Sequence, residues 1–331
     1  MQRVAAFGAN APPRFAQGRH AIGIDVGGTK IAGAIVNLSN GAITARIQVP
    51  TQAHLGGTAV LDSLAKMARG LFEVAAALHI QPVTLGVGVA ELVDPQGQVF
   101  SDYRIKWQGT DVQTALSARL SDFGPLAITL ASDVRAAAMA EARFGTGLGV
   151  LDFYYVTIGT GISGVLVQNG VPYAGSRGAA LVIANGHSMT HCAQCGHVAA
   201  QVVEDIASGP AIAAAFAPGC RAEDVLLAAA AGNPRALAII DHATAELGRS
   251  LALIVDALDP ACLIIGGGLG SASGRYFDSL TRATRAGLWQ AGDHHLPILQ
   301  AALGPDAGLI GAALAASLTR EPVDRPLTKS T

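Results

Sequence analysis

Cysteine is scarce in this chain of 331 residues, which contains only four. Cys220 and Cys262 lie far apart in the sequence, and only Cys192 and Cys195 lie close together. A fold held by disulfides needs more cysteines at regular spacings. We therefore expect reduced thiols and a fold that depends on its hydrophobic core.

Charge is also scarce, since 14% of the residues are charged and the formal net charge is −2. Without an excess of Lys and Arg the chain has no basic face that could neutralise a run of phosphates, so nucleic acid is not an expected partner. No apolar run reaches the roughly 18 to 20 residues that span a bilayer. The first twenty residues also lack the continuous apolar core of a signal peptide. The sequence predicts a soluble, cytoplasmic protein without a membrane partner.

Strand and turn patterns predict an α/β fold. Short β-rich runs separated by Gly, Asn and Ser turns occupy residues 21–51, and a similar pattern returns at residues 152–173. This near-repeat suggests two related lobes rather than one dinucleotide-binding sheet. Apolar residues at spacings of three and four predict helices, which we place at Thr58–Leu78, Val202–Ala215 and Pro234–Leu258.

The expected lobe boundaries follow from this pattern. Residues 1–20 and 321–331 lack periodicity and are expected to be flexible tails. Residues 21–131, joined by about 306–320, form the expected small lobe, and residues 132–305 form the expected large lobe.

Three glycine turns follow apolar strands. They supply the candidate nucleotide-binding residues, which are Asp25, Gly27, Gly28, Thr29 and Lys30 in "GIDVGGTK", Thr160 and Gly161 in "IGTGISG", and Gly267 and Gly268 in "IIGGGLG". Such turns let backbone N–H groups approach a phosphate, and a carboxylate at a strand end can hold magnesium through water. Each could also be a tight turn that simply needs glycine. "GIDVGGTK" has neither the Walker nor the dinucleotide spacing, but the three turns together favour a nucleotide cleft.

A serine and an aspartate stand where a predicted strand becomes an Ala-rich helix, in "ASDVRAAAMAE". Asp133 could cap that helix, which is a common structural role. It could instead act as a general base that takes a proton from a hydroxyl as the hydroxyl oxygen attacks the γ-phosphate of ATP. The residues by themselves leave both interpretations open.

These motifs occur in the order and spacing of a known family. "GIDVGGTK", "SDVRAAAMAEARFG", "YVTIGTGISG", "LDPACLIIGGG" and "ALGPDAGLIGAAL" resemble the ROK family (repressor, open reading frame, kinase) over about residues 21–318. The resemblance implies a two-lobed, actin-like ATPase (hexokinase-like) fold with a cleft between the lobes. It also implies a kinase that uses ATP and Mg²⁺ to phosphorylate a hexose or amino sugar. We further expect a homodimer.

The resemblance also implies roles for individual residues. Asp133 would be the base, and the candidates in the three glycine turns would bind the nucleotide and its phosphates. The expected acceptor-binding residues are Ser132, Asp133, Glu204, Arg104, Asn185 and His187.

The sugar-side motif departs from the family pattern, in which Glu and His of "GExGH" hold ring hydroxyls. A gap-free register puts Val182 at the Glu position and Asn185 at the His position, whereas a two-residue shift gives Ala184 and His187. Either register loses the Glu. Further departures replace the Asn before the base by Ser132, a Pro-Gly pair by Glu91, and an Asn near Trp107 by Arg104.

The segment "HSMTHCAQCGH" is a candidate structural zinc site, because thiolates and imidazoles suit tetrahedral zinc. The candidate ligands are Cys192, Cys195, His197 and either His187 or His191. The alternative is a surface loop whose ligands have been lost, because the family's full ligand set is not retained.

The phosphate-side motifs are intact while the sugar-side motifs have changed, which favours a changed acceptor over a dead enzyme. The sequence therefore predicts an ATP-dependent kinase of a primary hydroxyl on an unusual amino sugar or related sugar. The alternatives are a cyclitol kinase of secondary metabolism and a non-catalytic sugar-binding or regulatory ROK protein.

Overall fold

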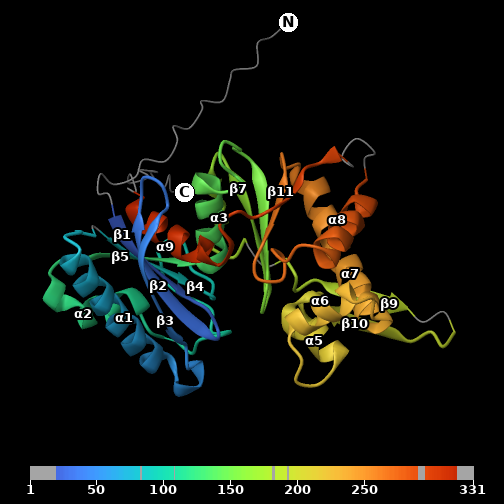
Figure 1. Ribbon diagram of the computed structural model, residues 1–331, viewed down its shortest axis with the longest axis horizontal. Helices are drawn as coiled ribbons and strands as arrows, with labels where there is room; N and C mark the ends of the chain where they lie inside the picture. The colour runs from blue at the N-terminus through green and yellow to red at the C-terminus, as the bar shows by residue number, and fades with distance from the viewer. Residues whose placement is uncertain are drawn as a thin grey trace, which may run out of the picture.

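The computed structural model describes residues 20–82, 84–107, 109–180, 183–191, 194–289 and 295–318. Two five-stranded sheets dominate it and confirm the predicted α/β class (Figure 1). His20, which the sequence assigned to the N-terminal tail, pairs with Asn37 as the first residue of a strand. The predicted tails at residues 1–19 and 321–331 lie outside the described residues.

The first sheet has the order β3-β2-β1-β4-β5. Its strands are β1 (His20–Val26), β2 (Lys30–Asn37), β3 (Ile43–Pro50), β4 (Thr84–Val89) and β5 (Ala127–Ser132). β1, β2 and β3 pair antiparallel, whereas β4 and β5 continue the sheet in parallel with β1. The carboxyl ends of β1, β4 and β5 therefore meet at one edge.

The second sheet repeats this arrangement in the order β8-β7-β6-β11-β12. Its strands are β6 (Phe153–Ile158), β7 (Ile162–Gln168), β8 (Val171–Pro172), β11 (Leu263–Gly266) and β12 (Ile298–Gln300). Again three strands pair antiparallel and two continue in parallel. A separate hairpin joins β9 (His187–His191) to β10 (Val198–Val202).

The helices cover the sheets on both faces. They are α1 (Gly57–Ala77), α2 (Val112–Arg119), α3 (Asp133–Phe144), α4 (Glu204–Ala207), α5 (Gly209–Phe216), α6 (Ala222–Ala230), α7 (Pro234–Leu258), α8 (Arg275–Gly287) and α9 (Ala307–Ser317). Short 3₁₀ turns lie at Ala53–Leu55, Ser121–Phe123 and Gly304–Asp306. α3 and α9 pack on each other between the two sheets (Figure 1).

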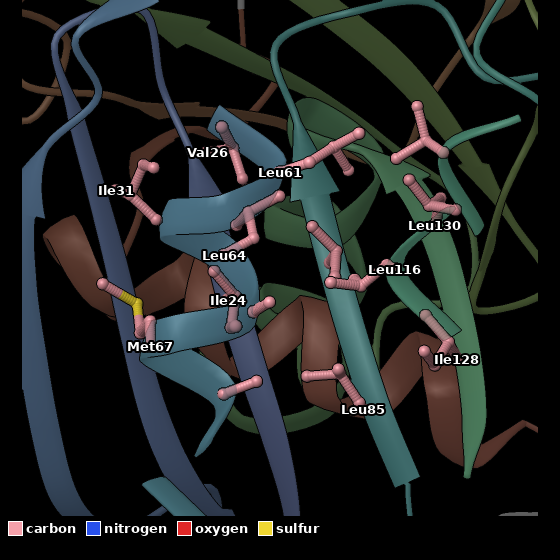
Figure 2. Close-up of a cluster of buried hydrophobic side chains, with 14 of the residues drawn as sticks. Ile24, Val26, Ile31, Leu61, Leu64, Met67, Leu85, Leu116, Ile128 and Leu130 are labelled. Carbon is pink, nitrogen blue, oxygen red and sulfur yellow. The ribbon is translucent and has the colours of Figure 1, made fainter. Parts of the chain in front are cut away.

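The outer face of the first sheet carries one of the main hydrophobic clusters. Figure 2 shows side chains of β1, β2, β4 and β5, among them Ile24 and Leu85, facing Leu61 and Leu64 of α1 and Leu116 of α2. Burial of each aliphatic side chain of this kind stabilises the folded state by about 1.5–3 kcal/mol. The cluster fixes the positions at which β1, β4 and β5 end.

The inner face of the first sheet is unusual because a helix backbone lies directly against it. A Cβ atom at Gly86 of β4 would lie 1.8 Å from the Ala312 carbonyl oxygen of α9, and one at Gly23 of β1 would lie 2.0 Å from the Leu309 carbonyl oxygen. Only glycine allows this approach, which brings the start of α9 to the carboxyl end of β1. The lobe boundary expected near residue 132 stays a prediction.

The helix predictions agree with the structure for α1 and α7, but the prediction of one helix over Val202–Ala215 is wrong. Val202 ends β10, and Ser208 interrupts the helical segment with extended backbone at φ −71° and ψ 163°. Ser208 Oγ accepts the N–H of Ala211, and Pro210 lies in the first turn of α5. Because Ser and Pro favour a helix start, the chain forms two short helices instead of one.

Candidate active site

Three carboxylates stand at the carboxyl ends of the three parallel strands of the first sheet. Asp25 is the penultimate residue of β1, Glu91 follows β4 by two residues, and Asp133 directly follows β5. The register pairs Val26 with Val89 and Val89 with Ser132, so the three strands end at the same level. Ligands bind at this edge in open α/β sheets.

A cleft of about 800 Å³ opens at this edge and reaches the second sheet. All nine predicted nucleotide residues line it: Asp25, Gly27, Gly28, Thr29, Lys30, Thr160, Gly161, Gly267 and Gly268. Asp133 lines the same cleft. The three glycine turns, which lie far apart in the sequence, therefore face one another across one cavity.

The β1–β2 turn leaves its polar groups open to the cleft. The Gly27 N–H donates to the Lys30 carbonyl oxygen at 3.0 Å, and Thr51 Oγ1 donates to the Gly27 carbonyl oxygen at 2.7 Å. These bonds fix the turn from behind, while Gly28 and Thr29 are exposed. Because Gly28 has no Cβ, its backbone can be approached closely by an anion.

The loop after β11 packs against the end of β6. Gly267 has φ +82°, and a Cβ atom there would lie 2.4 Å from the Ile158 carbonyl oxygen. That carbonyl accepts the N–H groups of Leu269 and Gly270 at 2.9 and 3.1 Å. The conformation and the close contact both require glycine, so the backbone of residues 267–268 is held at the cleft wall.

Asp133 has the electrostatic environment of a proton acceptor. Burial, the neighbouring Asp25 carboxylate and, more weakly, Glu91 raise its pKa to about 7, against the opposing hydrogen bond from the Val134 N–H at 2.7 Å. Burial likewise raises the pKa of Asp25 to about 6, although Lys30 and Arg46 counteract it. A base with a pKa near neutrality is well matched to its task.

The two adjacent carboxylates also form a donor set that fits magnesium, which prefers carboxylate oxygens and water. Asp25 and Asp133 repel each other at neutral pH, as the raised pKa of Asp133 indicates. A divalent cation near them would offset that repulsion.

Ser132 lies behind the cleft rather than in it, although the sequence placed it among the acceptor-binding residues. It is fully buried, is not part of the cleft lining, and its hydroxyl donates to the Glu91 carbonyl oxygen at 2.8 Å. The buried Arg135 contacts Ser132 Oγ at 3.2 Å and also donates to the Val93 carbonyl oxygen. These contacts tie the start of α3, and with it Asp133, to the segment after β4.

Of the other residues predicted to bind the acceptor, Arg104, Asn185 and Glu204 line the cleft, whereas His187 does not. Arg104 Nη2 lies 3.6 Å from Glu204 Oε1, and Glu204 Oε2 accepts the Ile162 N–H at 2.7 Å. The placement of Asn185 favours the gap-free register, because in that register it occupies the position of the family's sugar-binding His. In this register Val182 takes the place of the family's Glu, and it lies outside the described residues.

The sequence did not assign a role to several residues that the cleft includes. Gly308 at the start of α9 is one, because a Cβ atom there would lie 2.8 Å from Asp25 Cγ. Tyr103 and Ser101 are others, from the loop that precedes α2. The glycine-rich "GPDAG" could have indicated the close contact of Gly308 with Asp25. No local pattern marks the loop that carries Ser101 and Tyr103.

The predicted zinc site is only partly described, because Cys192 lies outside the described residues. Cys195 and His197 are exposed between β9 and β10, and His187 is exposed on β9. Within the described ranges no three His, Cys, Asp or Glu side chains gather as metal ligands would. The zinc site stays a prediction.

This cleft between two duplicated α/β halves defines a nucleotide-dependent enzyme of the actin-like ATPase class. Residues 21–318 match the ROK family, and the chain belongs to it, as its motifs predicted. No helix in the described part of the chain is long and apolar enough to cross a membrane.

Relatives of known function agree with this assignment. The chain is 29% identical to a glucokinase of Streptomyces coelicolor over 326 residues, covering 91% of this chain and 98% of the relative. It is 30% identical to an N-acetylmannosamine kinase of Escherichia coli O157:H7 over 303 residues, covering 89% and 97%. The ROK glucokinase of Streptomyces griseus, solved with glucose and AMPPNP, has a TM-score of 0.76 at 26% identity and coverage of 89% and 98%. The predicted fold and the predicted enzyme class, an ATP-dependent sugar kinase, are therefore confirmed.

Proposed function

We propose that this chain transfers the γ-phosphate of ATP to a primary hydroxyl of a hexose-like acceptor, an unusual amino sugar or a related sugar. The observation that carries the proposal is the position of Asp133. It stands in one cleft with three glycine turns, and its pKa is raised to about 7 by burial and by Asp25. A single side chain is thus placed to accept a proton opposite a wall suited to phosphates.

The reaction follows from this placement. Asp133 takes the proton of the acceptor hydroxyl while the hydroxyl oxygen forms a bond to the γ-phosphorus and the bond to the β-phosphate oxygen breaks. The N–H groups of the three glycine turns and Lys30 bind the phosphates and hold them in line. Magnesium, held by Asp25 through water, would supply positive charge to the phosphate oxygens.

The acceptor is proposed from the residues on the other wall. Neither sequence register keeps the acidic residue of the family's sugar motif, and Ala184, its replacement in the shifted register, is buried. Asn185 and the Arg104–Glu204 pair remain to bind the acceptor. This change in polar groups favours an acceptor that differs from glucose at the ring positions near the anomeric carbon.

The test is ATP consumption by the purified protein with a panel of hexoses, amino sugars, N-acylated amino sugars and cyclitols. Turnover with at least one sugar and release of a sugar phosphate is the expected result. Turnover confined to cyclitols would mean that the acceptor is a cyclitol rather than a sugar. Binding of sugars without turnover of any acceptor would mean a non-catalytic sugar-binding protein. Elemental analysis and sedimentation of the same preparation test the zinc and the homodimer.

A further inference from the structure

Glu91 is the most extensively hydrogen-bonded carboxylate at the cleft. Its Oε1 accepts the backbone N–H groups of Arg104 and of Ile105, the latter at 2.7 Å. Its Oε2 accepts the Tyr103 N–H at 3.0 Å and the hydroxyl of Ser101. The residue is only 5% exposed, so its carboxyl oxygens are hydrogen-bonded mainly by these donors rather than by water.

The hydrogen bonds to Glu91 hold residues 101–105 against the end of β4. Ser101 Oγ, which donates to Glu91, also accepts the Leu92 N–H at 2.8 Å. Residues 101–105 therefore wrap around one carboxylate that is anchored at the end of β4. A loop without helix or strand structure gains a defined conformation in this way, and it presents Arg104 to the cleft together with Ser101 and Tyr103.

Arg104 reaches across the cleft to the second half of the molecule. Its guanidinium lies 4.7 Å from the centre of the Tyr103 ring and 3.6 Å from the Glu204 carboxylate at the start of α4. Within the described part of the chain this guanidinium donates no hydrogen bond, since 3.6 Å is too long for one. Its five N–H donors are available to a ligand, and Glu204 Oε1 is available as an acceptor.

We propose that Arg104 and Glu204 form a paired selectivity site, with Glu91 as the positioning residue of Arg104, and that it selects acceptors with an uncharged oxygen-bearing group there over a free ammonium. This inference rests on the proposed function. A hydroxyl can accept from Arg104 and donate to Glu204, and the carbonyl of an acylated amine can accept from Arg104. An ammonium cannot accept a hydrogen bond, and the guanidinium repels it.

The pair must act together for this selection. Glu204 alone would attract an ammonium, and Arg104 offsets that attraction because the two charges lie 3.6 Å apart. Their side chains are 33% and 17% exposed, so solvent screens part of the interaction. Removing Arg104 and removing Glu204 should therefore shift the preference between the ammonium and the uncharged group in opposite directions.

The experiment compares a hexose, its 2-amino derivative and its N-acetylated 2-amino derivative in both the gluco and manno series, at a pH that keeps the free amine protonated. The measured quantity is the ratio of kcat/KM for the N-acetylated sugar to kcat/KM for the free amine. Arg104→Gln should lower this ratio about tenfold, and Glu204→Gln should raise it, as expected for charges about 4 Å apart that water largely screens. Lys106→Gln is the matched control, because Lys106 is an exposed cation near the same loop that does not line the cleft.

The role of Glu91 is tested by combining its substitution with that of Arg104 in a double-mutant cycle. Glu91→Gln should raise KM for the acceptor about tenfold with KM for ATP unchanged, and adding Arg104→Gln should raise it little further. Glu141→Gln is the control, because Glu141 is a buried carboxylate that also binds loop N–H groups, those of Thr146, Ala302 and Leu303. Its effect should add to that of Arg104→Gln. Ser101→Ala, which removes one hydrogen bond from Glu91, gives a milder second variant should Glu91→Gln fail to fold.

The outcomes separate the two proposals. A wild-type protein that phosphorylates no sugar contradicts the proposed function. A wild type that phosphorylates sugars, with ratios in Arg104→Gln and Glu204→Gln that match Lys106→Gln, overturns the selectivity site and leaves the proposed function intact. Additive effects of Glu91→Gln and Arg104→Gln would remove Glu91 as the positioning residue.

Discussion

The two walls of the cleft are built in different ways. The wall that we propose faces the phosphates consists of backbone, in glycine turns such as Gly27–Thr29 and Gly267–Gly268 that are fixed by short-range bonds and close contacts. The wall that we propose faces the acceptor consists of side chains from distant segments, among them Glu91, Arg104 and Glu204. A backbone wall accepts few substitutions, whereas a side-chain wall can change its ligand by single replacements. Three departures from the family pattern, Glu91, Arg104 and Asn185, lie on the second wall.

The largest effect is expected where the two walls meet, at Asp133. Asp133→Asn keeps the size of the side chain but removes the proton acceptor, so kcat should fall by about 10²- to 10⁴-fold. Binding of ATP should remain, because the glycine turns are untouched, and calorimetry with magnesium and a non-hydrolysable ATP analogue checks this. Asp205→Asn, at an exposed aspartate outside the cleft lining, is the control. Turnover retained by Asp133→Asn would remove the aspartate from the mechanism.

A second prediction concerns the acceptor wall alone. With Asn185 in the cleft and no acidic residue in the altered sugar motif, glucose should be a poor substrate. Ring hydroxyls buried without partners cost about 1–3 kcal/mol, so kcat/KM for glucose should lie about tenfold or more below that of the best acceptor. Steady-state kinetics over the acceptor panel measures this. A glucose value equal to or above that of every amino sugar and cyclitol would contradict the prediction.

The same difference between the walls explains what the sequence could predict. Asp25, the three glycine turns and Asp133 stand at the ends of strands that are recognisable from local patterns, and all of them line the cleft. The interruption at Ser208 was missed, because the apolar spacing outweighed the cap and the proline that follows. Glu91 could be noticed as a departure, but its four donors come from residues ten to fourteen positions away. Contacts of that kind depend on the path of a loop, which no local pattern encodes.

A third prediction tests whether the phosphate wall depends on its backbone. Gly267→Ala places a Cβ atom 2.4 Å from the Ile158 carbonyl oxygen at φ +82°, and should raise KM for ATP while KM for the acceptor changes little. The expected cost is about 1–3 kcal/mol, or about tenfold in affinity. Gly274→Ala is the matched control, since Gly274 has φ +97° but no heavy atom within 4 Å of the added Cβ. Equal effects of the two substitutions would attribute the change to the backbone angle alone rather than to the contact with β6.

A fourth prediction concerns the pH dependence of stability, to which Asp133 and the neighbouring Asp25 both contribute. The pKa values of Asp25 and Asp133 in the folded protein, about 6 and about 7, lie above the ordinary value of 3.8, so the folded state binds these protons more tightly than the unfolded state. Their stabilisation is therefore complete below about pH 4 and is lost as the pH rises through about 7. Each proton contributes at most about 1.4 kcal/mol per pH unit.

Thermal unfolding of the ligand-free protein between about pH 5 and pH 8 measures this slope. Asp133→Asn cannot ionise at this position, so its melting temperature should fall less steeply with rising pH, and the variant should be the more stable protein at the alkaline end. Asp205→Asn should follow the wild type. Magnesium should flatten the wild-type curve, because a cation beside Asp25 and Asp133 favours both ionised carboxylates. Parallel curves for the wild type and Asp133→Asn would mean that Asp133 is already ionised in the empty cleft, and that solvent or a cation, rather than burial beside Asp25, controls its charge.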